Sequence, residues 1–159
     1  DLLLIWAALP RVLRTLTRPI AARDYWTSTP FRQWITTEVF NAIYVSRERT
    51  ADEDPLAPLV QALDAGDSII LFPEGTRGHA EEPQEFKAGL YNLALRFPHV
   101  VLVPAWINNV QRVMPKGEVV PVPVLCSVSF GAPLQLHDGE PRREFLDRAR
   151  HAVMALRDV

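Results

Sequence analysis

An apolar segment that stops at a proline constrains the fold of this chain more than any other feature of its sequence. Residues 68–72 are Ser-Ile-Ile-Leu-Phe, preceded by Gly66 and Asp67. This short run of aliphatic and β-branched residues is typical of a buried strand. Pro73 has no backbone N–H to donate to a sheet, so we expect the strand to end before it. Open α/β sheets bind ligands at the carboxyl ends of their strands, so the residues after Phe72 are candidates for function.

The residues directly after this proline combine a carboxylate, a glycine, a hydroxyl and a guanidinium, in the order Glu74, Gly75, Thr76, Arg77. Gly75 allows a backbone conformation or a close approach that a side chain would block. The planar fork of Arg77 suits a phosphate or a carboxylate. From these residues alone, a solvated polar turn stays open as the alternative.

Phe72 to Arg77 is similar to the FPEGTR block of the glycerolipid acyltransferases, the family of 1-acyl-glycerol-3-phosphate acyltransferase. A contiguous match of this kind is more specific than a spaced glycine pattern. The resemblance implies an α/β fold with a mostly parallel sheet, built from βαβ units and covered by helices, as a single acyltransferase domain over residues 1–159. It implies transfer of a fatty acyl group from an acyl thioester to the hydroxyl of a lysophosphatidate-type acceptor in phospholipid biosynthesis.

The start of the chain resembles the first block of that family, H-x-x-x-x-D, whose aspartate leads into an apolar helix as Asp1 leads into residues 2–9. The resemblance implies that Asp1 orients a histidine base five residues upstream, and that the chain lacks its N-terminal segment with this histidine. None of the histidines present is followed by an aspartate at that spacing. An N-cap explains Asp1 equally well. The predicted catalytic residues are Asp1 and Glu74.

Three cations are the candidate phosphate contacts besides Arg77. Arg23 ends a predicted strand, where the family carries a basic residue. Arg47 ends a segment that resembles the block G-x-I-x-I-D-R, with Asn41 in place of the glycine. Lys87 opens a helix with the family pattern F-K-x-G, and a helix N-terminus favours anions. Each is also explained as a solvated surface cation. The predicted substrate-binding set is Arg47, Gly75, Thr76, Arg77, Arg23 and Lys87.

The segment from Val103 to Ile107 resembles the block V-P-V-x-I. The resemblance implies that Pro104 and Ile107 shape the acyl pocket, and core packing of the same residues does not conflict with this.

The remaining pattern predicts βαβ units. Strand 42–45, amphipathic helix 54–63 and strand 68–72 form one unit with parallel strands. We expect residues 100–107 to be the next strand of this series. Further predicted elements are a strand at 18–23, helices at 2–9, from Thr29, at 86–95 and at 141–157, and a strand at 122–130.

Composition excludes some functions and leaves others open. The net charge is −2 and there is no basic run, so a nucleic-acid partner is not expected. Scattered histidines predict no metal site. No cofactor is implied beyond acyl-CoA or acyl carrier protein as the thioester co-substrate. The alternatives are a non-catalytic lipid- or phosphate-binding domain, or an acyltransferase for another lysophospholipid.

Membrane association is expected from the substrates and from the family resemblance. It is not expected from a membrane span, because no apolar stretch reaches the roughly 18–20 residues that cross a bilayer. The resemblance implies a membrane-associated protein on the cytoplasmic face. Leu2, Leu3, Trp6 and segment 26–34 are candidates for an interfacial surface, and burial explains them equally well.

Overall fold

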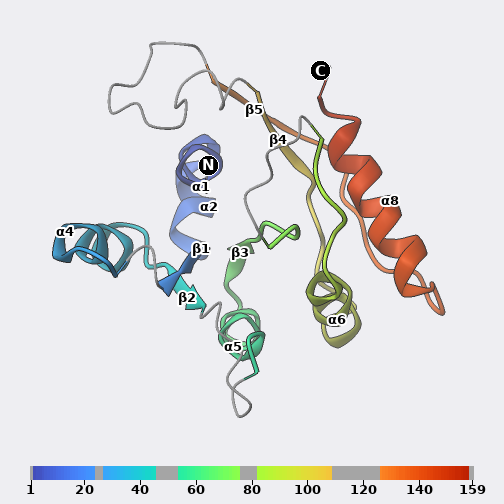
Figure 1. Ribbon diagram of the computed structural model, residues 1–159, viewed down its shortest axis with the longest axis horizontal. Helices are drawn as coiled ribbons and strands as arrows, with labels where there is room; N and C mark the ends of the chain where they lie inside the picture. The colour runs from blue at the N-terminus through green and yellow to red at the C-terminus, as the bar shows by residue number, and fades with distance from the viewer. Residues whose placement is uncertain (1, 24–26, 46–53, 76–81, 109–125, 158–159) are drawn as a thin grey trace. The chain divides into compact units, whose positions relative to one another are not determined.

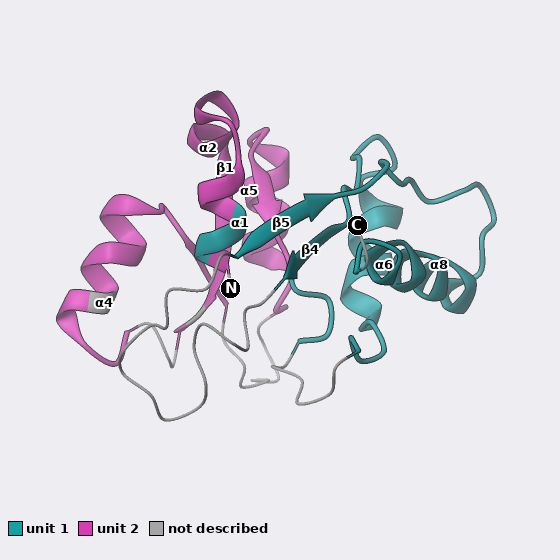
Figure 2. Ribbon diagram, turned by 90° about the horizontal axis from the view of Figure 1, so that it is seen from above, with its two compact units in different colours: residues 1, 3–5, 72–159 teal, residues 2, 6–71 magenta. Residues whose placement is uncertain are grey.

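The computed structural model describes residues 2–23, 27–45, 54–75, 82–108 and 126–157 (Figure 1). The chain divides into two compact units, coloured in Figure 2. Unit 2 contains residues 2 and 6–71, and unit 1 contains residues 1, 3–5 and 72–159. Each is described by itself.

Unit 2 is built on a three-stranded parallel sheet with strand order β2-β1-β3. The strands are β1 (Thr17–Ala22), β2 (Ile43–Val45) and β3 (Ser68–Ile70). Both outer strands run parallel to β1. The parallel α/β architecture that the sequence predicts is therefore confirmed, with β1 lying between the two strands of the predicted βαβ unit.

Proline is uncommon inside a central strand, and Pro19 lies in one. Residues 17–19 of β1 pair with β3, and residues 20–22 pair with β2. Pro19 is fully buried and is the last residue of the β3 ladder. Because it lacks an N–H, it fits at the point where pairing changes from one neighbour to the other.

The structure has helices close to those predicted at 2–9, from Thr29 and at 54–63, and one more at 11–16 that was not predicted. Their bounds are α1 (Leu2–Ala8), α2 (Arg11–Leu16), α4 (Pro30–Trp34), the π-helix η1 (Ile35–Val39) and α5 (Ala57–Asp64). Helix α4 begins at Pro30, whose fixed φ suits a first helical position. Helix α5 buries Leu59, Val60 and Ala62, and Gly66 follows it with φ +87°. Helix α1 was predicted to be buried, but Ile5 is its only buried residue.

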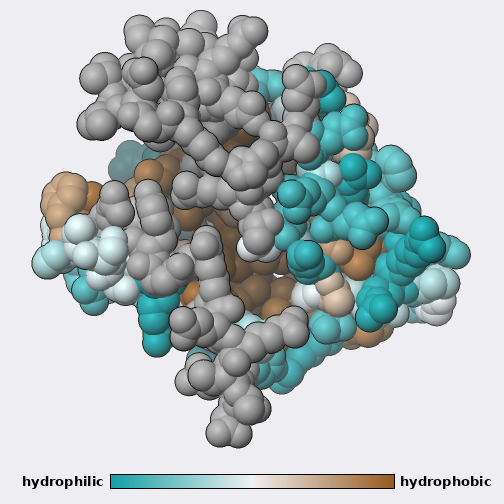
Figure 3. Space-filling model, viewed as in Figure 1, coloured by the Kyte–Doolittle hydropathy of each residue, from teal (hydrophilic) through white to brown (hydrophobic). Residues whose placement is uncertain are grey.

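The described residues of unit 1 from 72 onward form two helices and a pair of strands. Their bounds are α6 (Ala88–Arg96), β4 (Ala105–Asn108), β5 (Ser127–Phe130) and α8 (Arg142–Met154). Helices α6 and α8 pack through Phe145 of α8, which is fully buried. The centroid of its ring lies 6.0 Å from that of Tyr91 in α6. Hydrophilic side chains cover the outer face of α8 in Figure 3.

Strand β4 differs from the prediction for residues 100–107. Within the described ranges it pairs antiparallel with β5 and does not join the parallel sheet. Leu102 also bridges Leu134 in the antiparallel sense. An antiparallel neighbour from later in the chain satisfies the same backbone groups, and apolar content alone does not distinguish the two kinds of partner.

Helix α4 exposes two aromatic side chains. Phe31 and Trp34 of α4 are 69% and 57% exposed, and apolar side chains are visible over this helix in Figure 3. Among the residues that the structure describes, no helix combines the length and apolar character needed to cross a membrane.

Candidate functional site

The site begins with a tight turn at residues 72–75. Strand β3 ends at Ile70, before Pro73 as predicted. The Gly75 N–H donates to the Phe72 carbonyl at 3.1 Å and closes the turn. Gly75 has φ +72°, a conformation that side chains other than glycine rarely adopt. The glycine is therefore required by the backbone of this turn.

The turn is tied to the start of helix α6. The Lys87 N–H donates to the Pro73 carbonyl at 2.8 Å. Lys87 occupies the N-cap position of α6 with an extended backbone, φ −76° and ψ 152°. A Cβ on Gly75 would lie 3.6 Å from Lys87 Cγ, an ordinary contact distance. The structure thus brings two predicted site residues side by side.

Glu74 supports the same arrangement through its carboxylate. Its Oε2 accepts a hydrogen bond from the Gln84 backbone N–H at 2.8 Å. The preceding residue, Pro83, is also held, because Arg150 Nε of α8 donates to its carbonyl at 2.8 Å. The segment that leads into α6 is therefore fixed at two consecutive residues.

Glu74 keeps acceptor capacity after this bond. A carboxylate has about four lone-pair positions, and the hydrogen bond from the Gln84 N–H uses one of them. Among the described residues, no cation forms an ion pair with it. The half-buried carboxylate can accept a further hydrogen bond, for example from a hydroxyl group.

The positively charged residue Lys87 lies beside the same turn. The Lys87 side chain is exposed and has no acidic partner within the described part of the chain. The first turn of an α-helix leaves backbone N–H groups without intrahelical partners, and its dipole favours anions. Lys87 and the first turn of α6 together form a positive end beside Gly75, where a phosphate group would be stabilised.

The other predicted site residues fall into three groups. Arg23 directly follows β1 in unit 2 and is exposed, and its carbonyl accepts a hydrogen bond from Thr27 N at 2.9 Å. Pro104 and Ile107 belong to the β4 region of unit 1. The predicted residues that lie outside the described ranges are Asp1, Arg47, Thr76 and Arg77.

Pro104 and Ile107 have structural surroundings that explain their apolar character. Pro104 is buried, and its carbonyl accepts a hydrogen bond from Gly131 N at 2.8 Å. A Cβ on Gly131 would lie 2.9 Å from Pro104 Cγ, so only glycine fits there. Ile107 is half-buried and pairs with Val128. Their predicted place in an acyl pocket stays a prediction.

The clearest shifts in pKa belong to a second acidic group of unit 1. Arg148 donates from Nε to Glu140 Oε1 at 2.8 Å and from a terminal nitrogen to Oε2 at 2.7 Å. This hydrogen bonding lowers the pKa of Glu140 to about 2, and it raises the pKa of Arg148. Arg148 also donates to the Gln135 carbonyl at 2.8 Å. The pair joins α8 to the preceding loop and serves the fold.

Sequence reasoning did not identify Gln84, because it contributes a backbone N–H and its side chain carries no signal. It did explain Gly75 and anticipated the position of Lys87. Asn41 can now be explained as well: it has φ +47°, in the left-handed region where asparagine is the usual substitute for glycine.

Within the described residues, no group of three or more His, Cys, Asp or Glu side chains is placed to hold a metal ion.

Comparison with known proteins gives consistent matches. The family model Acyltransferase matches residues 1–108. The chain is 28% identical over 144 residues to the 1-acyl-sn-glycerol-3-phosphate acyltransferase alpha of Ovis aries, and equally to that of Bos taurus. Each match covers 87% of this chain and 48% of the relative, so the chain spans about half the length of these curated relatives.

A solved structure has a similar fold. The 1-acyl-sn-glycerophosphate (LPA) acyltransferase PlsC from Thermotoga maritima matches with a TM-score of 0.66 and 19% identity. The match covers 89% of this chain and 56% of that chain. At this identity the likeness concerns the fold. The family model covers well over half of the residues, and the chain therefore belongs to the Acyltransferase family.

Proposed function

We propose that this chain transfers a fatty acyl group from an acyl thioester to the hydroxyl of a lysophosphatidate-type acceptor in phospholipid biosynthesis. Family membership supports acyl transfer as the reaction class. The observation that supports a phosphorylated acceptor is the turn at residues 72–75, which lies against the positive start of α6. Lys87 has no acidic partner among the described residues, so its charge is available to an anionic substrate.

In the proposed reaction, the acceptor hydroxyl oxygen attacks the carbonyl carbon of the thioester. The new ester bond forms, the carbon–sulfur bond breaks, and the thiol leaves with a proton. A base takes the hydroxyl proton, and by the family resemblance this is a histidine five residues before Asp1, oriented by the Asp1 carboxylate. No acyl-enzyme intermediate is needed, because the hydroxyl attacks directly.

Glu74 and its neighbours would hold the acceptor. The free lone pairs of Glu74 can accept a hydrogen bond from the glycerol part, while its bond to Gln84 keeps the segment before α6 in place. Arg77, Arg47, Arg23 and Lys87 are the proposed phosphate contacts. Charge-assisted hydrogen bonds from such cations select a phosphorylated acceptor over a neutral one.

The acyl chain and the membrane complete the proposal. Pro104 and Ile107 are the proposed apolar contacts of the acyl group. Both the acceptor and the product are membrane lipids, so we place the protein at a membrane surface on the cytoplasmic side. The donor is acyl-CoA or acyl carrier protein.

The test is an assay of the complete protein with palmitoyl-CoA and lysophosphatidate, followed by mass spectrometry of the lipid product. We expect phosphatidate to form. The Arg77→Ala variant should lower kcat/KM for lysophosphatidate on the order of 100-fold, because the phosphate would lose a positioning contact. Arg96→Ala, an exposed arginine at the end of α6, is the control and should retain activity.

Two results would contradict parts of this proposal. Binding of lysophosphatidate without any product would indicate a non-catalytic lipid-binding domain. Faster turnover of another lysophospholipid, together with an unchanged kcat/KM for lysophosphatidate in Arg77→Ala, would show that the acceptor assignment is wrong.

A further inference from the structure

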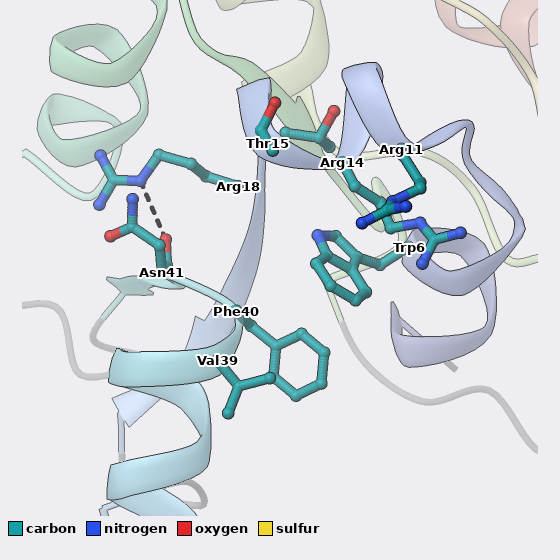
Figure 4. A pocket seen from close by; sticks show the side chains of 9 residues that line it. Trp6, Arg11, Arg14, Thr15, Arg18, Val39, Phe40 and Asn41 are labelled. Atoms are coloured by element: carbon teal, nitrogen blue, oxygen red, sulfur yellow. Dashed lines mark hydrogen bonds between the residues drawn. The ribbon is translucent and has the colours of Figure 1, made fainter.

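Unit 2 contains a cavity of about 290 Å³ that the proposed function does not use (Figure 4). It lies between α1, α2, the start of β1 and the end of η1. The lining residues are Trp6, Arg11, Arg14, Thr15, Thr17, Arg18, Val39, Phe40 and Asn41. The lining includes three arginines and no acidic residue.

The cavity lies at the amino edge of the parallel sheet. Thr17 and Arg18 begin β1, and Asn41 lies two residues before the first residue of β2. Arg23, a proposed substrate contact in this unit, follows the carboxyl end of β1. The two positions are at opposite ends of the strand, so the cavity is distinct from the acceptor contact that Arg23 would make.

The positive charge of this cavity is largely uncompensated. Arg18 is held by the Asn41 carbonyl at 2.9 Å and by Asp67 at 3.6 Å. Within the described ranges, Arg14 donates a hydrogen bond through Nε alone, to the Leu9 carbonyl at 2.8 Å, and Arg11 makes no hydrogen bond or ion pair. Among the described residues, no carboxylate pairs with either Arg11 or Arg14. A site with two such guanidinium groups attracts an anion.

A second observation in the same place also indicates a missing acceptor. Trp6 Nε1 is buried and has no hydrogen-bond partner in the described part of the chain. Leaving a buried donor unsatisfied destabilises a fold, so such a group needs an explanation. The indole ring packs edge-on against Phe40 at 4.9 Å and lies beside Arg14, whose guanidinium carbon is 5.5 Å from the ring centroid (Figure 4). An anion held by Arg11 and Arg14 would lie close to this N–H.

The surface of α2 indicates where such an anion comes from. Val12, Leu13 and Leu16 are 74%, 47% and 50% exposed on the helix that carries Arg11 and Arg14. Apolar side chains next to arginines are typical of a segment that lies at the surface of an anionic membrane. A soluble phosphate would gain nothing from the apolar side chains.

We propose that this cavity is a second anion site, which takes the phosphate of an anionic phospholipid headgroup. Arg11 and Arg14 bind the phosphate oxygens, and Trp6 Nε1 donates a hydrogen bond to one of them. The exposed apolar residues of α2 contact the lipid around it. This site binds lipid without reaction and does not depend on the proposed acyl transfer.

The first experiment measures binding of the full chain to phosphatidylcholine vesicles with and without phosphatidylglycerol. The double variant Arg11→Gln/Arg14→Gln should bind the anionic vesicles about 30-fold more weakly, because each basic residue near such a surface contributes about 1 kcal/mol. The matched control is Arg142→Gln/Arg143→Gln on α8, which removes the same charge from exposed positions. It should bind like the parent chain. Equal binding by both double variants would overturn the proposal.

The second experiment observes the cavity directly. The indole N–H resonance of Trp6 is assigned in the ¹⁵N-labelled full chain by its loss in Trp6→Phe. Short-chain phosphatidylglycerol should shift this resonance, and it should not do so in the double variant. A resonance that stays in place would overturn the site. A shift produced by glycerol 3-phosphate, without a preference for anionic vesicles, would overturn the lipid source and assign the cavity to a soluble phosphate.

Folding of the variants is checked by circular dichroism. If the double variant does not fold, Arg11→Gln alone replaces it, since the Arg11 side chain is exposed and has no partner among the described residues. The single variant should bind anionic vesicles about 5-fold more weakly. Unchanged binding by a folded Arg11→Gln would contradict the proposal.

Discussion

Glu74 and Glu140 are two glutamates of unit 1 that each accept a hydrogen bond from a backbone N–H. Glu74 accepts from Gln84 at 2.8 Å, and Glu140 accepts from His137 at 3.1 Å. They differ in their other partners. Glu140 is neutralised by two hydrogen bonds from Arg148, whereas Glu74 has no cation among the described residues.

We expect this difference to separate a role in stability from a role in function within one unit. A carboxylate whose charge is balanced by a guanidinium contributes to folding and has little left to offer a ligand. A carboxylate held only by a backbone N–H keeps lone pairs for a substrate. The arginines show the same contrast, since Arg148 is paired while Arg11 and Arg14 of unit 2 have no acidic partner among the described residues.

The largest effect is expected at Glu74. Glu74→Ala should lower kcat/KM for lysophosphatidate on the order of 100-fold, because the segment before α6 loses one of its two anchors and the acceptor loses a hydrogen bond. The free energy of unfolding, measured in urea, should change by less than about 1 kcal/mol. Glu74→Gln keeps an oxygen for the Gln84 N–H and should recover part of the activity. Unchanged turnover in Glu74→Ala would remove the distinction between the two glutamates.

Arg148→Met should have the reverse effect. It removes both hydrogen bonds to Glu140 and the one to the Gln135 carbonyl, and should lower the free energy of unfolding by about 2 kcal/mol. Turnover of the folded variant should equal that of the parent. Arg143→Met is the control, because Arg143 and Asp147 are 94% and 58% exposed and such pairs contribute about 0–1 kcal/mol. A loss of activity without a loss of stability would contradict the structural role.

The contribution of Glu140 should depend on pH in a defined direction. Its pKa is lowered from 4.5 to about 2 in the folded chain, chiefly by the hydrogen bond from Arg148. The folded state therefore gains stability above the unfolded pKa, and loses it as pH falls through the folded value. The urea-unfolding difference between the parent and Arg148→Met should be constant from about pH 6 to 8 and shrink progressively below about pH 4.5. A difference that grows on acidification would contradict the assignment.

The smallest effect is expected at Lys87, which is exposed. Lys87→Gln should raise KM for lysophosphatidate about 5-fold with little change in kcat, because the lost attraction is screened by solvent. High salt should reduce the difference from the parent, since ions screen exposed charges. For a neutral monoacylglycerol acceptor, the parent and the variant should have the same KM. A similar increase in KM for both acceptors would show that Lys87 does not contact the phosphate.

Much of unit 2 and of the turn could be predicted because the signals are local. Pro73 ends the strand, Gly75 supplies a positive φ, and Pro30 begins a helix. The parallel sheet follows from the alternation of short apolar runs with an amphipathic helix. The single-domain prediction and the functional roles of all the predicted site residues stay predictions.

Other features depend on partners that are distant in sequence. The sequence did not indicate that β4 would pair antiparallel with β5, because an apolar run fits either kind of sheet. It did not indicate that Arg150 would hold Pro83 across 67 positions. The cavity had a usable signal, since arginines at 11, 14 and 18 recur at helical spacing, but Arg18 lies on β1 in the structure.

The sequence by itself determined where strands stop, where the backbone needs glycine, and which side chains follow the strand ends. These properties depend on the φ range, hydrogen-bonding groups and polarity of residues close in the chain. Only the tertiary structure decided which charges cancel. Glu74 and Glu140 are the same residue type, and one of them is free to accept a hydrogen bond because no cation among the described residues is folded against it.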